Sequence, residues 1–324
     1  MRSINGMAER FRDLLASAEG IELPGCYDTL SATILERVGF KAVFLSGYGV
    51  AASLLGNPDI GLTSLVETSL MTKNVSSALR IPLVVDADNG YGNEDNVVRT
   101  VSELEHAGAA AMILEDQVFP KRCGHAGGKQ VIPLDQYIRK LECALKARQT
   151  PMCVVARTDA ASIDEGILRA KAFHAAGADV LLIDGLPSHD ALERVGSQVP
   201  GHKVINLIHG GKTPLLPSRL LHDLGFKIVL YSTPALYTAA HTMMAAMKRL
   251  QETRELESIS PVSTTFRQFQ QMMETQYLAR RGSEGLRRTD DAADVAPTAP
   301  GGFGVEESTR SRLLRAVPAE PGQA

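Results

Sequence analysis

A short pattern of apolar and polar residues recurs four times along the chain. Each copy is the end of an amphipathic helix, a glycine, and a mostly apolar run that ends on a polar residue. The glycines are Gly39, Gly108, Gly177 and Gly225, and the runs end at Ser46, Asp116, Asp184 and Ser232. Glycine suits the left-handed position just after a helix, and unbroken apolar runs are typical of strands buried on both faces. Repeated helix-then-strand units predict a parallel sheet.

The spacing of this pattern indicates how many strands the sheet contains. The first three glycines are 69 residues apart (39 to 108, and 108 to 177), which is two β/α units of about 35 residues each. The eight apolar runs are IELPGC (21–26), KAVFLS (41–46), IPLVVDAD (81–88), AAMILED (110–116), MCVVARTD (152–159), VLLID (180–184), KVINLI (203–208) and KIVLYS (227–232). Eight parallel strands with helices between them predict a TIM (β/α)8 barrel, and a doubly wound open sheet is the alternative.

Three regions follow from this pattern. Residues 1–250 are expected to form the catalytic barrel, closed by an amphipathic helix over 234–249. Residues 251–282 contain a helix whose apolar stripe has no place in a finished barrel, so we expect it to pack on another subunit or on the barrel's exterior. That stripe consists of Phe266, Phe269, Met272, Met273 and Tyr277. Residues 283–324 lose all periodicity and are expected to be disordered.

Composition and charge narrow the possible partners. The net charge of −3 gives no electrostatic reason to expect nucleic acid or an anionic membrane. No apolar stretch approaches the roughly 18 to 20 residues that span a bilayer, and the N-terminus lacks a secretory signal. The four cysteines match neither a disulfide framework nor a metal clip. We therefore expect a cytoplasmic protein that uses neither membrane nor nucleic acid as a partner.

Acidic residues gather at the ends of neighbouring strands, which converge at one mouth of a TIM barrel. Asp86 and Asp88 are two apart and point to the same face, and Glu115 ends the next strand. Such an oxygen-rich site suits Mg²⁺, and Asp59 could join it through water. The alternative is a set of solvated loop acids or helix caps.

Other strand ends and one loop carry further candidate chemistry. Arg157 could neutralise an anionic substrate, or form an internal salt bridge with Asp159 or Glu115. Ser46, Gly47 and Tyr48 offer hydroxyls and N–H groups that could hold an oxyanion. Cys123 lies between Arg122 and Gly124 in a cationic loop, which favours proton transfer or nucleophilic attack over a purely structural role.

Three motifs together resemble the isocitrate lyase and phosphoenolpyruvate mutase superfamily: DADNGYGN (86–93), LEDQVFPKRCGH (114–125) and VARTDA (155–160). KRCGH (121–125) is the signature of its lyase branch. SGYGVAASLLGNPDIGL (46–62) and GGKTP (210–214) resemble its smaller members, which include 2-methylisocitrate lyases, dimethylmalate lyases, the petal death protein and carboxyphosphonoenolpyruvate phosphonomutases. The resemblance implies TIM barrels that exchange their last helix within a homotetramer, and Mg²⁺ as cofactor, with Mn²⁺ as a substitute.

The resemblance also implies roles for single residues. Asp86 would bind the metal directly, with Asp59, Asp88 and Glu115 holding its waters. The 2-oxo carboxylate or enolate would be bound by Ser46, Gly47, Tyr48 and Arg157, and Cys123 would be the acid or base. The loop 121–129 would close over the substrate. The remaining expected substrate contacts are Asp88, Lys121, Gly124, His125, Asp184, Asn206 and His209.

Two of these positions depart from the superfamily pattern. Asp184 stands where several members have glutamate, and His209 replaces the acid that precedes GGKTP in them. Both changes suggest a different and more anionic distal group on the substrate, with neutral drift as the alternative.

The leading hypothesis is a Mg²⁺-dependent lyase that cleaves a C–C bond of a substituted malate-like acid through a 2-oxo acid enolate. The alternative is a phosphonomutase that makes or rearranges a P–C bond. Cys123 favours the lyase, because a phosphoryl shift needs no proton donor. A catalytically silent barrel that serves as a scaffold is a third hypothesis, and it predicts gaps in the acid set that the sequence does not have.

Overall fold

The eight predicted strands close into a parallel barrel. The computed structural model describes residues 4–122, 124–125 and 127–281. Its strands follow sequence order around the barrel, and the last pairs with the first. They are β1 (Ile21–Cys26), β2 (Val43–Leu45), β3 (Leu83–Asp86), β4 (Ala111–Glu115), β5 (Cys153–Thr158), β6 (Val180–Ile183), β7 (His202–Leu207) and β8 (Ile228–Tyr231). The TIM barrel is confirmed, and closure rules out the open sheet.

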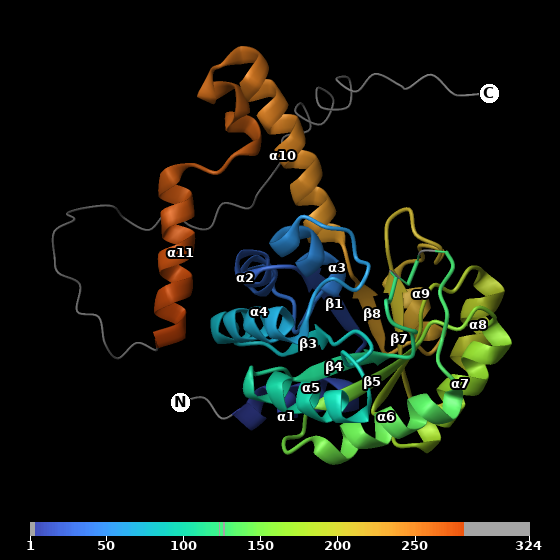
Figure 1. Ribbon diagram of the computed structural model, residues 1–324. Coiled ribbons are helices and arrows are strands. Elements are labelled where there is room, and N and C mark those ends of the chain that lie inside the picture. The colour runs from blue at the N-terminus through green and yellow to red at the C-terminus, as the bar shows by residue number, and fades with distance from the viewer. Residues whose placement is uncertain (1–3, 123, 126, 282–324) are drawn as a thin grey trace, which may run out of the picture. The chain divides into compact units, whose positions relative to one another are not determined.

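Helices alternate with these strands and surround them (Figure 1). They are α1 (Ile4–Ala16), α2 (Thr29–Val38), α3 (Gly47–Val50), the π-helical turn η1 (Ala51–Leu55), α4 (Leu65–Ala78), α5 (Glu94–His106), α6 (Leu134–Ala147), α7 (Ile163–Ala175), α8 (His189–Gln198), α9 (Ser218–Asp223), α10 (Pro234–Thr253), the 3-10 segment η2 (Leu256–Val262) and α11 (Phe266–Arg281). The four junction glycines have φ between 92° and 109°, a region that L side chains rarely adopt. This confirms the helix-to-strand junctions read from the sequence.

The interior of the barrel is polar at the mouth formed by the carboxyl ends of the strands, and apolar further inside. Because side chains alternate along a strand, residues two apart share a face. Inward apolar residues of β3 to β8 are therefore followed two positions later by inward polar ones. These pairs are Val84 and Asp86, Ile113 and Glu115, Val155 and Arg157, Leu182 and Asp184, Val204 and Asn206, and Leu230 and Ser232. One rule of alternation thus positions the whole ring of polar side chains.

The inward cluster extends to α1, and a second apolar cluster surrounds the strands. Phe11 of α1 is fully buried with the inward residues of the strands, so α1 contributes to the interior at the end opposite the mouth. The outward faces of the strands pack against α4 to α8 through a second cluster that includes Leu83, Leu114 and Phe173. No helix among the described residues is long and apolar enough to cross a membrane.

The C-terminal helices differ from one expectation. The segment 234–249 is helical as predicted, but no residue of α10 is buried, so it does not close the barrel within one chain. Its methionines Met243, Met244 and Met247 are exposed. The stripe on α11 is also largely exposed, with Phe266 at 84%, while Gln276 donates to Glu36 of α2 at 2.9 Å. The predicted disordered tail, 283–324, lies outside the described residues.

Candidate active site

The polar strand ends open into one cavity of about 380 Å³ at the mouth of the barrel. Ten predicted site residues line it: Ser46, Tyr48, Asp59, Asp86, Gly124, His125, Arg157, Asp184, Asn206 and His209. Asp88, Glu115 and Lys121 do not line it, but they are buried beside it and joined to it by ion pairs. Cys123, the predicted acid, lies outside the described residues.

An acidic cluster occupies the β3 side of the mouth. Lys121 Nζ lies 2.5 Å from Asp59 Oδ1 and 2.7 Å from Asp88 Oδ1, so one buried ammonium bridges two buried carboxylates. Asp88 has φ +46°, and its N–H donates to Asp86 Oδ1 at 3.3 Å. This backbone turn brings the two aspartates together, as their spacing predicts.

Burial sets the electrostatics of this cluster. Desolvation raises the pKa of Asp88 to about 6, with Asp86 and Asp59 adding to the rise and Lys121 opposing it. Desolvation also raises the pKa of Glu115 well above its usual value, against the opposing charge of Arg157. Burial alone would lower the pKa of Lys121, but Asp88, Asp86 and the other acids raise it well above its usual value. For both carboxylates, the nearby cation opposes the effect of burial without cancelling it.

The cluster fits a divalent cation that keeps several waters. Carboxylates outnumber lysines and arginines around the mouth, where Asp59, Asp86, Asp88, Glu115, Asp159 and Asp184 face Lys121, Lys129 and Arg157. Glu115 Oε1 is buried without a hydrogen-bond partner among the described residues. Across those residues, no three His, Cys, Asp or Glu side chains form a ready-made ligand shell. Mg²⁺ is usually bound by one or two carboxylates and several waters, and a buried carboxylate oxygen without a protein partner fits such a site.

Arg157 is held by three carboxylates. Its Nε lies 2.9 Å from Asp159 Oδ2, and its Nη2 lies 2.9 Å from Asp184 Oδ2 and 3.4 Å from Glu115 Oε2. Both salt bridges considered from the sequence are therefore present, with Asp184 as a third partner. Arg157 also lines the cavity, so three ion pairs fix its guanidinium at the cavity wall.

Asp184 connects Arg157 to the far side of the mouth. Ser232 Oγ donates to Asn206 Oδ1, and Asn206 Nδ2 donates to Asp184 Oδ1 at 3.1 Å. His125 Nδ1 accepts the Lys212 N–H at 3.0 Å, so the neutral ring carries its proton on Nε2, 3.4 Å from Asp184 Oδ1. Burial would raise the pKa of Asp184, but Arg157 and His125 outweigh it and hold that pKa well below its usual range.

The residues of the predicted oxyanion site lie at the mouth, where Ser46 and Gly47 bind other groups of the chain itself. Ser46 Oγ accepts the Gly49 N–H and caps α3, while the Gly47 N–H donates to Asp86 Oδ2 at 3.3 Å. A Cβ on Gly47 would lie 2.8 Å from that oxygen, so any side chain there would displace the carboxylate. The Tyr48 ring lines the cavity and meets Tyr237 edge-on, with 6.2 Å between centroids.

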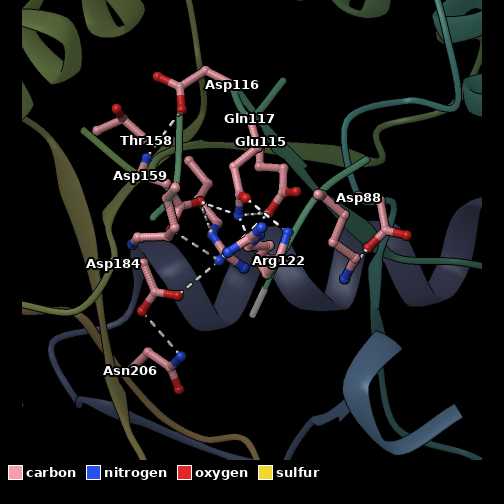
Figure 2. A network of polar contacts seen from close by, with 12 residues as sticks. Asp88, Glu115, Asp116, Gln117, Arg122, Thr158, Asp159, Asp184 and Asn206 are labelled. Carbon is pink, nitrogen blue, oxygen red and sulfur yellow. Dashed lines mark hydrogen bonds and ion pairs between the residues drawn. The ribbon is translucent and has the colours of Figure 1, made fainter. Parts of the chain in front are cut away.

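Sequence reasoning missed several residues of the mouth. Tyr237 on α10 and Thr233 line the cavity, and Gln117 lies in the polar network between Glu115 and Arg122 (Figure 2). The sequence signal that could have found them was their position. Gln117 and Thr233 each lie two residues after a strand, and Tyr237 lies in the first turn of the helix after β8. His209, which was predicted, lines the cavity but is exposed to solvent.

Comparisons with known proteins agree with this geometry. The family model for phosphoenolpyruvate phosphomutase matches residues 11–251. The 2,3-dimethylmalate lyase of Eubacterium barkeri is 36% identical over 270 residues, which is 82% of this chain and 93% of the relative. The carboxyvinyl-carboxyphosphonate phosphorylmutase of Arabidopsis thaliana is 37% identical over 273 residues, which is 82% of this chain and 80% of the relative.

Solved structures give the same result. An oxaloacetate acetylhydrolase in complex with 3,3-difluorooxalacetate superposes with a TM-score of 0.81 at 30% identity, covering 88% of this chain and 99% of the other. A 2,3-dimethylmalate lyase structure gives a TM-score of 0.79 at 29% identity, covering 89% and 99%. The chain therefore belongs to the phosphoenolpyruvate phosphomutase family, within the isocitrate lyase/phosphoenolpyruvate mutase superfamily of lyases and phosphomutases.

Proposed function

We propose that this protein is a Mg²⁺-dependent lyase that cleaves a C–C bond of a substituted malate-like 2-hydroxy acid. The observation that carries the proposal is one cavity that has the acidic cluster around Asp86 on one side and the buried guanidinium of Arg157 on the other. A cation site and a carboxylate site that face each other suit a small polycarboxylate. The similarity to 2,3-dimethylmalate lyase supports the same substrate class.

The metal would be held by Asp86 directly and by Asp59, Asp88 and Glu115 through water. Mn²⁺ prefers similar oxygen ligands and is expected to substitute. When bound there, Mg²⁺ would polarise the substrate's 2-oxygen and carboxylate and favour the negative charge that develops on them.

The side chains around the cavity would perform the remaining steps. Arg157 binds the substrate carboxylate, and Ser46 and Gly47 orient the 2-oxygen. Tyr48 takes the proton of the 2-hydroxyl as the bond between C2 and C3 breaks. The electron pair of that bond stays on C3, next to the second carboxylate, and C2 becomes the carbonyl carbon of a 2-oxo acid. Cys123 then delivers a proton to C3 and completes the second product.

Around this centre, the remaining predicted contacts would hold the rest of the substrate. Asp184, Asn206 and His209 lie on the side of the cavity away from the acidic cluster, where the distal substituent would fit. Lys121, Gly124 and His125 belong to the loop 121–129, which we propose closes over the bound substrate. Asp88, bound to Lys121, would join this loop to the metal site.

The deciding experiment measures products. Incubation with 2,3-dimethylmalate or 2-methylisocitrate and Mg²⁺ should release pyruvate, and incubation with oxaloacetate should release oxalate, each measured by chromatography. A new phosphonate phosphorus resonance from a phosphoenolpyruvate-type substrate, without these products, would support the phosphonomutase, which the similarity to the Arabidopsis enzyme favours as second candidate. If the protein turned over neither class of substrate, the hypothesis of a catalytically silent scaffold would remain.

The proton donor can be tested separately. Cys123→Ser should lower kcat by about 10²- to 10⁴-fold, since a serine hydroxyl is a much weaker acid. Oxalate binding, measured by calorimetry with Mg²⁺, should change less than about threefold. Cys143→Ser is the matched control, because Cys143 is a half-buried thiol on α6 and should keep full activity. Normal turnover by Cys123→Ser would refute the role of Cys123.

We further propose a homotetramer in which neighbouring barrels exchange α11. The support is the largely exposed apolar stripe of α11, together with the exposed methionines of α10. Light scattering on the purified chain should give four times the monomer mass of 34.8 kDa. Replacing Phe269 and Met273 by Asp should lower that mass, and an unchanged tetramer would argue against exchange.

A further inference from the structure

The loop that carries the predicted acid leaves the barrel from a paired base. After β4, Gln117 forms an isolated antiparallel bridge with Val131. The Val118 N–H donates to Gln130 O, and the Ile132 N–H donates to Asp116 O, each at 2.9 Å. The two ends of the loop are therefore held together, and its position over the mouth depends on contacts made further along.

One side chain holds a peptide inside this loop. Gln117 Oε1 accepts the Arg122 N–H at 2.9 Å, and Gln117 Nε2 donates to Arg122 O at 2.8 Å. The amide of Gln117 thus binds both polar groups of one residue's backbone, as a paired strand would. Gln117 itself is 2% exposed, and Figure 2 shows it between Glu115 and Arg122.

The same amide reaches the charged residues of the mouth. Gln117 Nε2 lies 3.1 Å from Asp159 Oδ2 and 3.3 Å from Glu115 Oε2. The Arg122 carbonyl only accepts hydrogen bonds and the Arg122 N–H only donates one, so the amide nitrogen must face the carbonyl and the amide oxygen must face the N–H. The amide therefore has one allowed orientation, and it joins the loop to the two acids that also bind Arg157.

The other contacts that hold the loop fix its backbone less tightly. Lys121 binds Asp59 and Asp88, and Lys129 binds Asp159 at 2.6 Å. A lysine is a point charge on a flexible stem, so such ion pairs tolerate displacement of the backbone that carries them. Two hydrogen bonds to one backbone residue allow much less displacement. Arg122 directly precedes Cys123 in the sequence, so Gln117 holds the backbone residue next to the predicted acid.

We propose that Gln117 is a positioning residue for the reaction: its amide sets the backbone of Arg122, and so the placement of the segment that delivers the proton, relative to Glu115 and Arg157. The effect on proton delivery rests on the proposed function, whereas the anchoring of Arg122 does not. The alternative is that Gln117 is a buried polar residue that stabilises the fold and has no specific effect on the reaction.

The test compares Gln117→Met, which keeps the volume but removes all four hydrogen bonds, with Gln117→Glu, which sets a third carboxylate against Asp159 and Glu115. The control is Glu105→Gln. Glu105 is a buried side chain that accepts the N–H groups of Gln149 and Thr150 in the loop before β5, away from the mouth. Its loss should lower the melting temperature without affecting turnover.

Two readouts separate positioning from general support. The first is kcat and KM with the substrate found for the wild type. Both Gln117 variants should lower kcat by about 10- to 100-fold, because small misplacements of reacting groups have effects of this size, while KM changes less than about threefold. The second is limited trypsin digestion, scored by mass spectrometry as cleavage after Arg122. The Arg122 side chain is exposed, so in the wild type the held backbone of Arg122 should limit cleavage by trypsin. The rate of cleavage after Arg122 should therefore rise about tenfold or more in both Gln117 variants.

The outcomes are distinct. Faster cleavage after Arg122 together with a lower kcat, at a melting temperature no lower than that of Glu105→Gln, supports the proposal. Unchanged cleavage in both variants would overturn the anchoring, and a kcat no lower than the control's would overturn the positioning role. If the wild type turns over no substrate, the proposed function fails, and the digestion still decides whether Gln117 anchors the loop.

Discussion

The two ends of the barrel interior are built from the same strands and are buried to a similar extent, yet their chemistry is opposite. Away from the mouth, the inward residues are apolar and Phe11 of α1 packs among them. At the mouth, Asp86, Glu115 and Arg157 occupy equivalent inward positions. Burial therefore does not distinguish a stabilising layer from a functional one. The difference lies in what the buried groups require.

Apolar groups need only contact, whereas buried charges need partners. Removing apolar surface from water is favourable by itself. Burying a carboxylate is unfavourable unless ion pairs or hydrogen bonds offset the loss of water. The raised pKa values of Asp88 and Glu115 indicate that these offsets are incomplete. The buried charges of the mouth thus lower the stability of the fold, and the apolar layer supplies it.

Asp86→Ala should produce the largest effect, which should be on turnover and not on stability. We expect loss of the direct metal ligand to lower turnover by about 10³-fold or more, since a bound metal supplies several kcal/mol of charge stabilisation. The metal-free protein should unfold at the same temperature or higher, because one member of a repelling acidic cluster is gone. Product assays, Mn²⁺ binding by electron paramagnetic resonance and thermal melts test this. Turnover without metal would contradict the assignment.

Phe11→Ala should show the reverse. Truncating a fully buried aromatic side chain should lower the free energy of unfolding by about 3–5 kcal/mol. The kcat at 25 °C should stay within about twofold, because Phe11 lies away from the mouth. Urea unfolding and the same product assay are the measurements. If kcat fell as far as in Asp86→Ala, the two ends would not be separable.

Asp184→Asn should have an intermediate effect. The amide is nearly isosteric, but it loses the ion pair with Arg157 Nη2 at 2.9 Å. Arg157 keeps Asp159 and Glu115, so we expect kcat/KM to fall about tenfold, which corresponds to about 1.4 kcal/mol. Steady-state kinetics test this, with Asp164→Asn, an exposed acid on α7, as the control. An unchanged kcat/KM would mean that Asp184 does not help to position Arg157.

His209→Ala should have the smallest effect. His209 lines the cavity but is exposed to solvent, and exposed polar contacts contribute up to about 1 kcal/mol. We expect KM to rise less than about fivefold, and only for substrates whose distal group is anionic. A panel of substituted malates with neutral and charged distal groups measures this. Equal changes across the panel would exclude a role for His209 in selecting the distal group.

Much of the molecule could be predicted because the necessary signals are local. The glycine junctions and apolar runs located all eight strands, and the polar strand ends located the mouth. The exposed face of α10 was not predicted, because its amphipathic pattern indicates a helix with an apolar side and says nothing about which surface covers it. Gln117 was missed for a similar reason, since a single glutamine after a strand carries no pattern.

The sequence by itself determined the order of the strands, their inward and outward faces, and which residue types reach the mouth. These follow from the alternation of side chains along each strand, a property of neighbouring residues. Only the tertiary structure decided the partners: Lys121 between Asp59 and Asp88, Arg157 among three carboxylates, and Gln117 on the backbone of Arg122. Most of these contacts join residues far apart in the chain, and their distances exist only once the barrel closes and brings the strand ends into one ring.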